Sequence, residues 1–415
     1  MERLVFHIDV NSAYLSWEAA RRVAEGGEDL RQIPSAIAGD PENRTGVILA
    51  KSIPAKQFRV RTGEPVAMAL RKCPGLVLAR PDFRLYEKNS KAFMDICRRY
   101  APVVEKFSID ECFLDMSGTG RLYPDPLQAA YDIKDAIREE LGFTVNVGIS
   151  RNKVLAKMAS DFEKPDKVHT LFPEEIETKL WPLPVGELFS VGHATAEKLE
   201  RSGIHTIGEL AAADTRRTRP LLGKKLAQQL YEYANGIDPT PVLAEPEEAK
   251  GYSVSTTLAE DVTTMEEANK ILLELADSVT ARIRADHARA YCISVSIRSS
   301  QFKNRSHQKK LEEATDITKE VYEVSKGLLS ELWESRIPLR LLGISLMQIV
   351  HEDAIQTTLF SDEKKEKARK LDKTLDSIRN RYGLDTVKRG SACQNPLNVG
   401  KKYRAQIENQ KEAEE

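Results

Sequence analysis

A stretch rich in proline, glycine and acids divides this chain and limits how it can fold. Residues 239–251 (PTPVLAEPEEAKG) hold four Pro or Gly in thirteen positions, which is typical of a linker between domains. Before it, a mixed strand and helix pattern gives way to helices alone at about residue 171. After it, the pattern is strand, helix, strand, strand, helix and strand, to about residue 350. A chain of 415 residues is also too long for one core, so we expect a multidomain α+β protein.

The composition is that of a globular protein. Hydrophobic residues make up 41% and charged residues 30% of the chain, which excludes collagenous and disordered classes. No apolar run approaches the ~18 residues of a membrane span, and Asp9 interrupts the N-terminal apolar stretch, so we expect neither membrane insertion nor secretion. Five cysteines without a CxxC pair favour a reducing compartment, which predicts a cytoplasmic protein.

Basic residues gather in one part of the chain although its net charge is only −1. Residues 282–310 contain eight Lys or Arg and a single acid. Such a local excess is typical of a surface that binds a polyanion. A solvated basic face is the alternative.

The first 165 residues predict a small antiparallel sheet. LVFHIDV reads as a buried strand that ends near Asp9, and FSIDECFLDMSG as a strand pair or a sharply bent strand. With residues 11–75 set aside as an insertion, the remaining strands and helices follow the order of a ferredoxin-like layer.

Three carboxylates stand out at the strand ends. Asp9 ends the first strand, whereas Asp110 and Glu111 are adjacent, so both can face one site only where a strand bends or ends. Acids gathered at one sheet edge repel one another unless a divalent cation lies between them, and such oxygen ligands suit Mg²⁺ or Mn²⁺. Two ions of this kind can stabilise both the attacking and the leaving oxygen of a phosphoryl transfer. Taken alone, the acids could also be a solvated strand end.

Three long motifs carry a family resemblance. FHIDVNSAYLSWE, SIDECFLDMS and VGISRNKVLAKMASDFEKP, in this order and spacing, resemble the catalytic core of Y-family translesion DNA polymerases, and the similarity runs to about residue 350. The resemblance implies a right-hand polymerase with a ferredoxin-like palm, small fingers, a helical thumb and an α+β little finger. The implied domains are the palm at 1–10 and 76–165, the fingers at 11–75, the thumb at 166–240, a linker at 241–250, the little finger at 251–350 and a tail at 351–415.

The resemblance also implies the metal site. Asp9 and Asp110 would each contact two Mg²⁺ ions, with Mn²⁺ as a possible substitute, and Glu111 would complete the site of the catalytic ion. The backbone carbonyl of Val10 would face the nucleotide-bound ion. Many family members have a further acid two residues after the first, where this chain has Asn11.

Further residues are implied to bind the nucleotide. Tyr14 is similar to the family's steric gate, whose ring excludes a ribose 2′-hydroxyl, and Lys164 matches a lysine that contacts the triphosphate. Many members carry a Y-x-x-R element on the fingers. The aligned positions here are Ile53, which has no hydroxyl, and Lys56, which supplies charge without the fork of arginine.

The DNA contacts implied by the resemblance lie outside the palm. LFSVGHATAEKL followed by GIHTIGEL resembles a helix-hairpin-helix, with Gly192 in the turn and Ser190 where a first glycine is usual. Arg298, Lys303 and Arg305, in the basic segment, are the expected phosphate contacts of the little finger.

The tail carries a short motif. Gln356, Leu359 and Phe360 in QTTLF resemble the bacterial sliding-clamp binding peptide, in which a Leu-Phe pair fills a pocket. The implied partners are therefore primer-template DNA, deoxynucleoside triphosphates and the clamp, and we expect a monomer.

Together these features predict a low-fidelity polymerase for lesion bypass and DNA repair, because short fingers leave few shape checks on the nascent base pair. The sequence shows no second cluster of carboxylates, so we do not expect a proofreading exonuclease activity. Two alternatives are a palm-type nucleotidyl cyclase and a catalytically inactive DNA-binding scaffold. The cyclase would need no helix-hairpin-helix, basic domain or clamp peptide, and the presence of all three acids argues against the scaffold.

Overall fold

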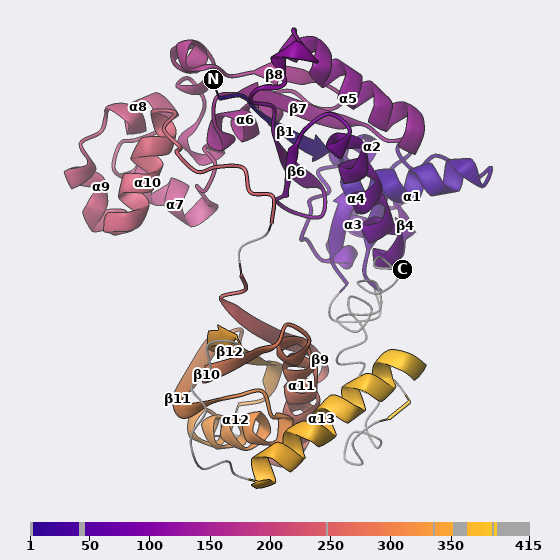
Figure 1. Cartoon of the computed structure of the whole chain (residues 1–415), viewed down its shortest axis with the longest axis vertical. Coiled ribbons are helices and arrows are strands. Elements are labelled where there is room, and N and C mark those ends of the chain that lie inside the picture. Colours follow the sequence, from indigo (N-terminus) through magenta and orange to yellow (C-terminus); the bar gives the residue numbers. More distant parts are fainter. Residues whose placement is uncertain are drawn as a thin grey trace. The chain divides into compact units, whose positions relative to one another are not determined.

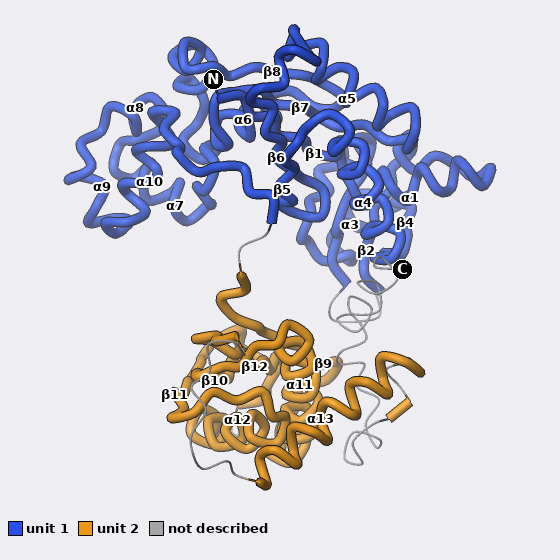
Figure 2. Tube along the Cα trace, in the orientation of Figure 1, with its two compact units in different colours: residues 1–40, 46–246 blue, residues 41–45, 247–415 orange. Residues whose placement is uncertain are grey.

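The chain forms two compact units. The computed structural model describes residues 3–40, 46–245, 248–334, 337–351, 363–383 and 386–387. One unit comprises residues 1–40 and 46–246 and the other residues 41–45 and 247–415 (Figure 2). Over the residues described, the first unit has two sheets and the second has one, and each unit has its own apolar core.

A five-stranded sheet with the order β5-β6-β1-β7-β8 is the centre of the first unit (Figure 1). The central strand β1 pairs antiparallel with β6 and with β7, whereas β8 pairs parallel with β7. The strands are β1 (Val5–Val10), β5 (Val103–Lys106), β6 (Glu111–Asp115), β7 (Val145–Ser150) and β8 (Val168–Thr170).

The alternation of side chains along β1 separates the core from the site. Phe6, Ile8 and Val10 enter the apolar core with residues of the helices α1 (Ala13–Ala24), α4 (Phe83–Arg98) and α5 (Pro126–Leu141). Because successive strand residues point to opposite faces, His7 and Asp9 face the other side of the sheet. Helix α6 (Lys153–Ser160) packs on that side. It comes so close to β7 that a Cβ on Gly148 would overlap the carbonyl of Ala156.

A small three-stranded sheet with the order β3-β2-β4 accounts for most of the expected insertion. It consists of β2 (Ser35–Ala38), β3 (Ile48–Lys51) and β4 (Val77–Ala79), with the helices α2 (Ile53–Gln57) and α3 (Val66–Lys72). The expected boundary between fingers and palm after residue 75 differs from this arrangement. β4 pairs parallel with β2, so it belongs to the small sheet and not to the five-stranded one.

Helices follow β8, as the sequence predicts. They are α7 (His193–Arg201), α8 (Ile207–Ala212), α9 (Thr215–Leu222) and α10 (Lys224–Ala234), preceded by short 3-10 or π turns at Pro173–Glu175, Ile176–Leu180 and Val185–Glu187. Thr206 and Glu209 form a capping box that begins α8. Leu199, Leu210 and Leu230 join the buried apolar cluster of these helices.

The second unit has the expected order of strand, helix, strand, strand, helix, strand. Its sheet has the order β11-β10-β12-β9, and apolar residues of α11 and α12 pack against it. The elements are β9 (Gly251–Val262), α11 (Met265–Ala285), β10 (Ala288–Ser299), β11 (Asn304–Thr315), α12 (Thr318–Leu332) and β12 (Leu339–His351), followed by the separate helix α13 (Glu363–Tyr382).

The mixed sheets and helices of these units confirm the predicted multidomain α+β class. Among the described residues, no helix is long and apolar enough to span a bilayer.

Candidate active site

Two of the expected acids lie side by side on the five-stranded sheet. Asp9 in β1 and Glu111 in β6 are direct partners in the antiparallel pairing of these strands. Residues opposite each other in such a pair have Cβ atoms about 4.5–5.5 Å apart. The amide of Val10 donates to the carbonyl of Asp110 at 3.0 Å, which fastens the β5–β6 turn to the end of β1. The structure therefore brings together segments that are far apart in the sequence.

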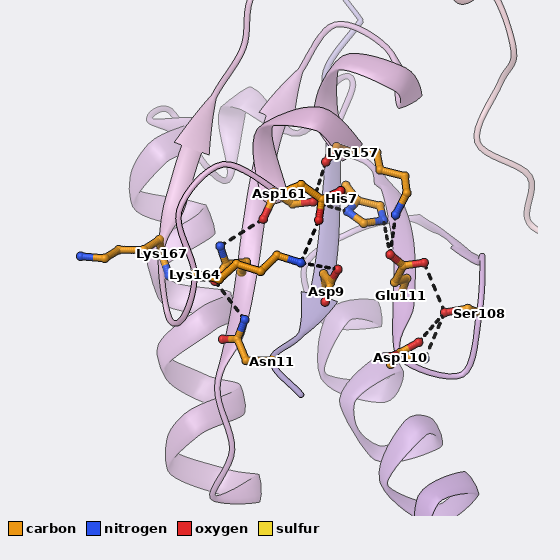
Figure 3. Close-up of polar contacts among 12 residues, drawn as sticks. His7, Asp9, Asn11, Ser108, Asp110, Glu111, Lys157, Asp161, Lys164 and Lys167 are labelled. Carbon is orange, nitrogen blue, oxygen red and sulfur yellow. Dashed lines mark hydrogen bonds and ion pairs between the residues drawn. The ribbon is translucent and has the colours of Figure 1, made fainter. Parts of the chain in front are cut away.

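Lysine ammonium groups neutralise both acids (Figure 3). Lys164 Nζ lies 2.8 Å from Asp9 Oδ2 and 2.8 Å from Asp161 Oδ1. Lys157 Nζ donates to Glu111 Oε1. Burial raises the pKa of Asp9 to about 6 although Lys164 opposes this shift, and the neighbouring charge of Glu111 also raises it. Asp9 thus sits in an environment that favours a nearby cation.

Asp110 is oriented differently from the other two acids. Ser108 Oγ donates to Asp110 Oδ1 at 2.7 Å and lies 3.4 Å from Glu111 Oε2. Figure 3 shows the Asp110 side chain turned toward Ser108. Within the described ranges, no three His, Cys, Asp or Glu side chains are arranged to hold a metal ion. The three carboxylates therefore do not converge on one point in this arrangement.

The residues present nevertheless fit a divalent cation. Asp9 and Glu111 supply carboxylate oxygens and Val10 a backbone carbonyl, which are the ligands that Mg²⁺ prefers. The ammonium groups of Lys157 and Lys164 already bind to these carboxylates, so positive charge is stabilised here.

Helix α6 contributes groups that the sequence analysis missed. Lys157 lies over the rings of Phe107 and Phe189, with Nζ 5.4 and 5.6 Å from their centroids. It is buried, and it occupies a position among Val154, Leu155, Met158 and Ala159, which are apolar. A lysine on the buried face of an amphipathic helix was the signal that could have identified it.

His7 connects α6 to the same face of the sheet. Its ring is fully buried, and Nδ1 lies 2.7 Å from Ser160 Oγ. The Ser160 hydroxyl donates to the Lys157 carbonyl, so it accepts from His7, and the histidine proton is on Nδ1. Nε2 then presents a lone pair 4.0 Å from Glu111 Oε1. Burial and the neighbouring lysines lower the pKa of His7 well below its usual value, so the ring is neutral.

Two asparagines hold the loop that carries Lys164. Asn11 Nδ2 donates to Asn146 Oδ1 at 3.1 Å, and the amide of Asp166 donates to Asn11 Oδ1 at 2.9 Å. Asn146 Nδ2 donates to the carbonyl of Glu163 at 2.7 Å. Asn11 therefore acts here as a structural link between β1 and this loop.

Aromatic rings support Tyr14 from behind. The Tyr14 ring stacks on Tyr86 with a centroid distance of 4.5 Å, and Phe83 meets Tyr14 edge-on at 6.1 Å. Tyr86 is completely buried, whereas Tyr14 is partly exposed. Burial raises the pKa of the Tyr14 hydroxyl, and so does the nearby charge of Asp110. The ring of Tyr14 thus lies beside the acids with little room to retreat.

Comparison with known families gives three matches along the chain. Residues 8–161 match the impB/mucB/samB family, and residues 249–359 match the C-terminal domain of that family. Residues 186–238 match the thumb domain of DNA polymerase-iota.

Curated relatives decide the assignment. The DNA polymerase IV of Clostridium acetobutylicum is 44% identical over 392 residues, which cover 94% of this chain and 98% of that protein. The chain belongs to the Y family of DNA polymerases. The DNA polymerase IV of Clostridium kluyveri is 38% identical over 96% of this chain and 100% of that protein. The solved Y-family DNA polymerase chimera "Dbh-Dpo4(243-245)-Dbh" shares the fold, with a TM-score of 0.70 and 22% identity over 84% of this chain and all of that one.

In the turn expected to belong to a helix-hairpin-helix, the backbone strain lies at a serine and not at the glycine. Ser190 has φ = +74°, the left-handed conformation that favours glycine. Gly192, the residue expected to matter, has φ = −84° and open space where a Cβ would lie, and it is the N-cap of α7. The strained turn therefore uses serine where a glycine is usual.

The expected DNA contacts of the second unit lie on one hairpin. Arg298 is opposite Asn304 in the β10–β11 pair and donates from Nε to its Oδ1 at 2.7 Å. Lys303 and Arg305 are exposed nearby. Arg340, which the sequence analysis did not select, lies 4.8 Å from the centroid of the exposed Phe302 ring.

The remaining predicted site residues are Lys56, in the region of the small sheet, and the clamp-binding residues of the tail. Lys56 is exposed on α2. Burial is the main cause that lowers the pKa of Lys51, and the neighbouring charge of Lys56 lowers it further. Lys51 is thus a second cation of this region that the sequence analysis missed. Gln356, Leu359 and Phe360 lie outside the described residues.

Proposed function

We propose that this translesion DNA polymerase extends a primer on damaged templates with Asp9, Asp110 and Glu111 at its catalytic centre. Its substrates as a DNA polymerase are DNA and deoxynucleoside triphosphates. The observation that carries the proposal is the direct pairing of Asp9 with Glu111 beside Lys164. Such a concentration of acids and cations on a sheet face suits transfer of a phosphoryl group.

Two Mg²⁺ ions, or Mn²⁺ in their place, are the proposed cofactors. Y-family polymerases use divalent metal ions. Asp9, Asp110, Glu111 and the Val10 carbonyl would hold them, and bound ions would neutralise charge on the triphosphate and on the attacking oxygen. Ser108 and Lys157, which now bind Asp110 and Glu111, would hold these carboxylates in place.

Lys164 and Lys56 are proposed to bind the triphosphate. Lys164 pairs with Asp9 and Asp161 and is positioned by the loop that Asn11 and Asn146 hold. An ammonium group on a partly exposed loop can exchange a carboxylate partner for a phosphate oxygen, because both are anionic acceptors. We assign this role to Lys164 because its ammonium group brings a positive charge next to Asp9.

Tyr14 is the proposed steric gate. Its ring is supported by Tyr86 and Phe83, and a supported ring cannot move aside for a ribose 2′-hydroxyl. The same position of the ring leaves room for a deoxyribose, which has no 2′-hydroxyl.

The small sheet β3-β2-β4 with the short helices α2 and α3 is proposed as the fingers. The five-stranded sheet would be the palm, α7–α10 the thumb and β9–β12 with α11 and α12 the little finger. α2 and α3 have five and seven residues, which is too short for a long closing helix. Few closing contacts around the base pair would give low fidelity and room for damaged bases.

Two regions are proposed to bind the DNA duplex. The turn at Gly192 would place amides of the α7 N-terminus next to a phosphate, and Arg298, Lys303 and Arg305 would contact phosphates elsewhere. These contacts are independent of base sequence, as lesion bypass requires.

A sliding clamp is the proposed protein partner, bound through Gln356, Leu359 and Phe360. Tethering raises the effective concentration of a polymerase that dissociates often. A monomeric polymerase in the cytoplasm fits this arrangement.

Primer extension tests the assignment. Purified protein with a primed template, deoxynucleotides and Mg²⁺ should add nucleotides, and Asp110→Ala should abolish this while leaving DNA binding intact. A protein that binds DNA but never extends the primer would be a scaffold, and cyclic nucleotide production would identify a cyclase. Either result would overturn the proposal.

A further inference from the structure

Helix α13 presents a row of charges to the rest of its unit. The helix begins beyond residue 359, where the match to the family's C-terminal domain ends. Its paired residues recur every three or four positions, so they lie on one helix face. They are Lys365, Arg369, Asp372, Asp376 and Arg379.

Each of these charges meets the opposite charge on the domain. Arg379 Nη1 lies 2.8 Å from Asp277 Oδ2, and both side chains are more than 90% buried. Arg284 of α11 binds Asp376 through two nitrogens at 2.6 and 3.2 Å. Arg284 also donates to the Asp316 carbonyl at 2.7 Å. Positive and negative side chains thus follow one another along α13 in the order that pairs each with an opposite charge of the surface beneath it. This match sets a single register of the helix on that surface.

One cluster of these contacts lies where β11 passes into α12. Arg369 Nε is 2.7 Å from Asp316 Oδ1, and Asp316 is almost completely buried. The amide of Thr318 donates to Asp372 Oδ2 at 2.9 Å. Ile317, the N-cap residue of α12, has no side-chain acceptor for this amide, so α13 supplies the carboxylate that the helix N-terminus favours.

Strand β11 is anchored mainly by its pairing with β10, and it has few apolar contacts with the rest of its unit. It is an edge strand, and Leu311 is the one member of β11 that packs on the apolar cluster of this unit. Its pairing with β10 shifts between Lys310 and Thr315, so the residues between them leave the regular ladder. Glu313 lies in this irregular part, and Lys365 Nζ holds it at 2.7 Å.

We propose that α13 is a brace that fixes the β11–α12 junction and thereby positions the cations of β11 for the DNA backbone. The inference rests on the proposed role of this unit in DNA binding. Arg305, Lys309 and Lys310 lie on the same strand, upstream of the braced junction. A strand held at both its ladder and its C-terminal end keeps these cations in one geometry, which lowers the entropy lost on binding.

The test compares two charge-neutral double variants. Arg369→Gln with Asp372→Asn removes the contacts at the junction, whereas Glu366→Gln with Lys370→Gln changes two exposed residues of the same helix. Net charge is unchanged in both, so non-specific attraction to DNA stays equal. Full-length proteins are compared by amide hydrogen exchange and by DNA affinity across a salt series.

We expect amides of residues 311–318 and of α13 to exchange at least tenfold faster in the junction variant. DNA affinity should fall three- to tenfold, with the rate of nucleotide addition at saturating DNA unchanged. Lys365→Gln, which removes the partly exposed pairs with Glu313 and Glu320, should give a smaller increase in the exchange of the same amides without endangering the fold. Exchange and affinity equal to those of the control variant would overturn the brace.

The role of β11 itself is tested separately. If Arg305→Gln weakens DNA binding and the junction variant does not, the brace is wrong and the DNA-binding role stands. If Arg305→Gln leaves affinity and its salt dependence unchanged, the DNA contact of this strand fails, and with it the positioning role of α13.

Discussion

The ring of Tyr14 lies flat on the ring of Tyr86, with the two planes 11° apart and the centroids 4.5 Å apart. Tyr86 is wholly buried in α4, and Phe83 stands edge-on to it at 5.8 Å. The position of the proposed gate is therefore determined by the packing of a helix that lies 70 residues further along the chain, and not by α1 alone.

Replacing Tyr14 should relax the choice of sugar. In Tyr14→Ala no ring excludes the 2′-hydroxyl, and an overpacking cost of roughly 1–3 kcal/mol corresponds to an increase of about 5- to 150-fold in ribonucleotide incorporation. Single-nucleotide kinetics with matched ribo- and deoxynucleotides measure this. Unchanged discrimination would remove Tyr14 from the gate.

Replacing Tyr86 should show whether the gate needs support. Tyr86→Leu removes the stacked ring, so we expect weaker sugar discrimination than in the wild type but stronger than in Tyr14→Ala. Tyr86→Phe is the matched control, because it keeps the stack and removes a buried hydroxyl that has no hydrogen-bond partner in the structure. Equal discrimination in the Leu and Phe variants would contradict the supporting role.

Lys164 should matter for nucleotide binding. Loss of a hydrogen bond between charged groups costs about 1.5–3 kcal/mol, so Lys164→Gln should raise KM for the nucleotide by roughly 10- to 100-fold. Lys167→Gln, on the same loop but half-exposed and 3.8 Å from Glu163, should have little effect. Pre-steady-state titration with deoxynucleotide distinguishes the two variants, and equal behaviour would argue against a phosphate contact by Lys164.

The pair of Lys157 and Glu111 should show strong coupling in stability. Removing one partner of a buried pair leaves an uncompensated charge, so Lys157→Met should destabilise the first unit by about 3–5 kcal/mol. Adding Glu111→Gln removes that charge and should restore most of the loss. Urea unfolding of the four proteins of this cycle measures the coupling, and additive effects would mean that the pair is largely solvated.

The proposed clamp-binding peptide is best tested without shortening the chain. A truncation before residue 356 would also delete α13, whereas Leu359→Ala with Phe360→Ala changes only the expected anchors. We expect this variant to extend short primers normally and to lose stimulation by a bacterial sliding clamp. Replacing Thr357 and Thr358 by alanine is the control. Clamp stimulation that survives the loss of Leu359 and Phe360 would show that another segment binds the clamp.

Periodicity and motif spacing predicted much of the architecture. The order of strands and helices in the second unit and the helical run after β8 both agree with the structure. These features depend on side-chain patterns within one element, and such patterns are local. The sequence did not predict that β4 belongs to the small sheet, because its pairing with β2 joins residues 42 positions apart and three residues are too few to indicate a partner.

Sequence patterns alone predicted most strands and helices and the family, because strand ends, motifs and composition depend on short stretches of chain. Three-dimensional packing was needed to show that Lys157 pairs with Glu111 and Lys164 with Asp9. It also showed that Tyr86 stacks on Tyr14 and that α13 supplies a carboxylate to the N-terminus of α12. Such contacts join residues distant in sequence, and they exist only after sheet order and helix packing have brought the side chains within a few ångströms of one another.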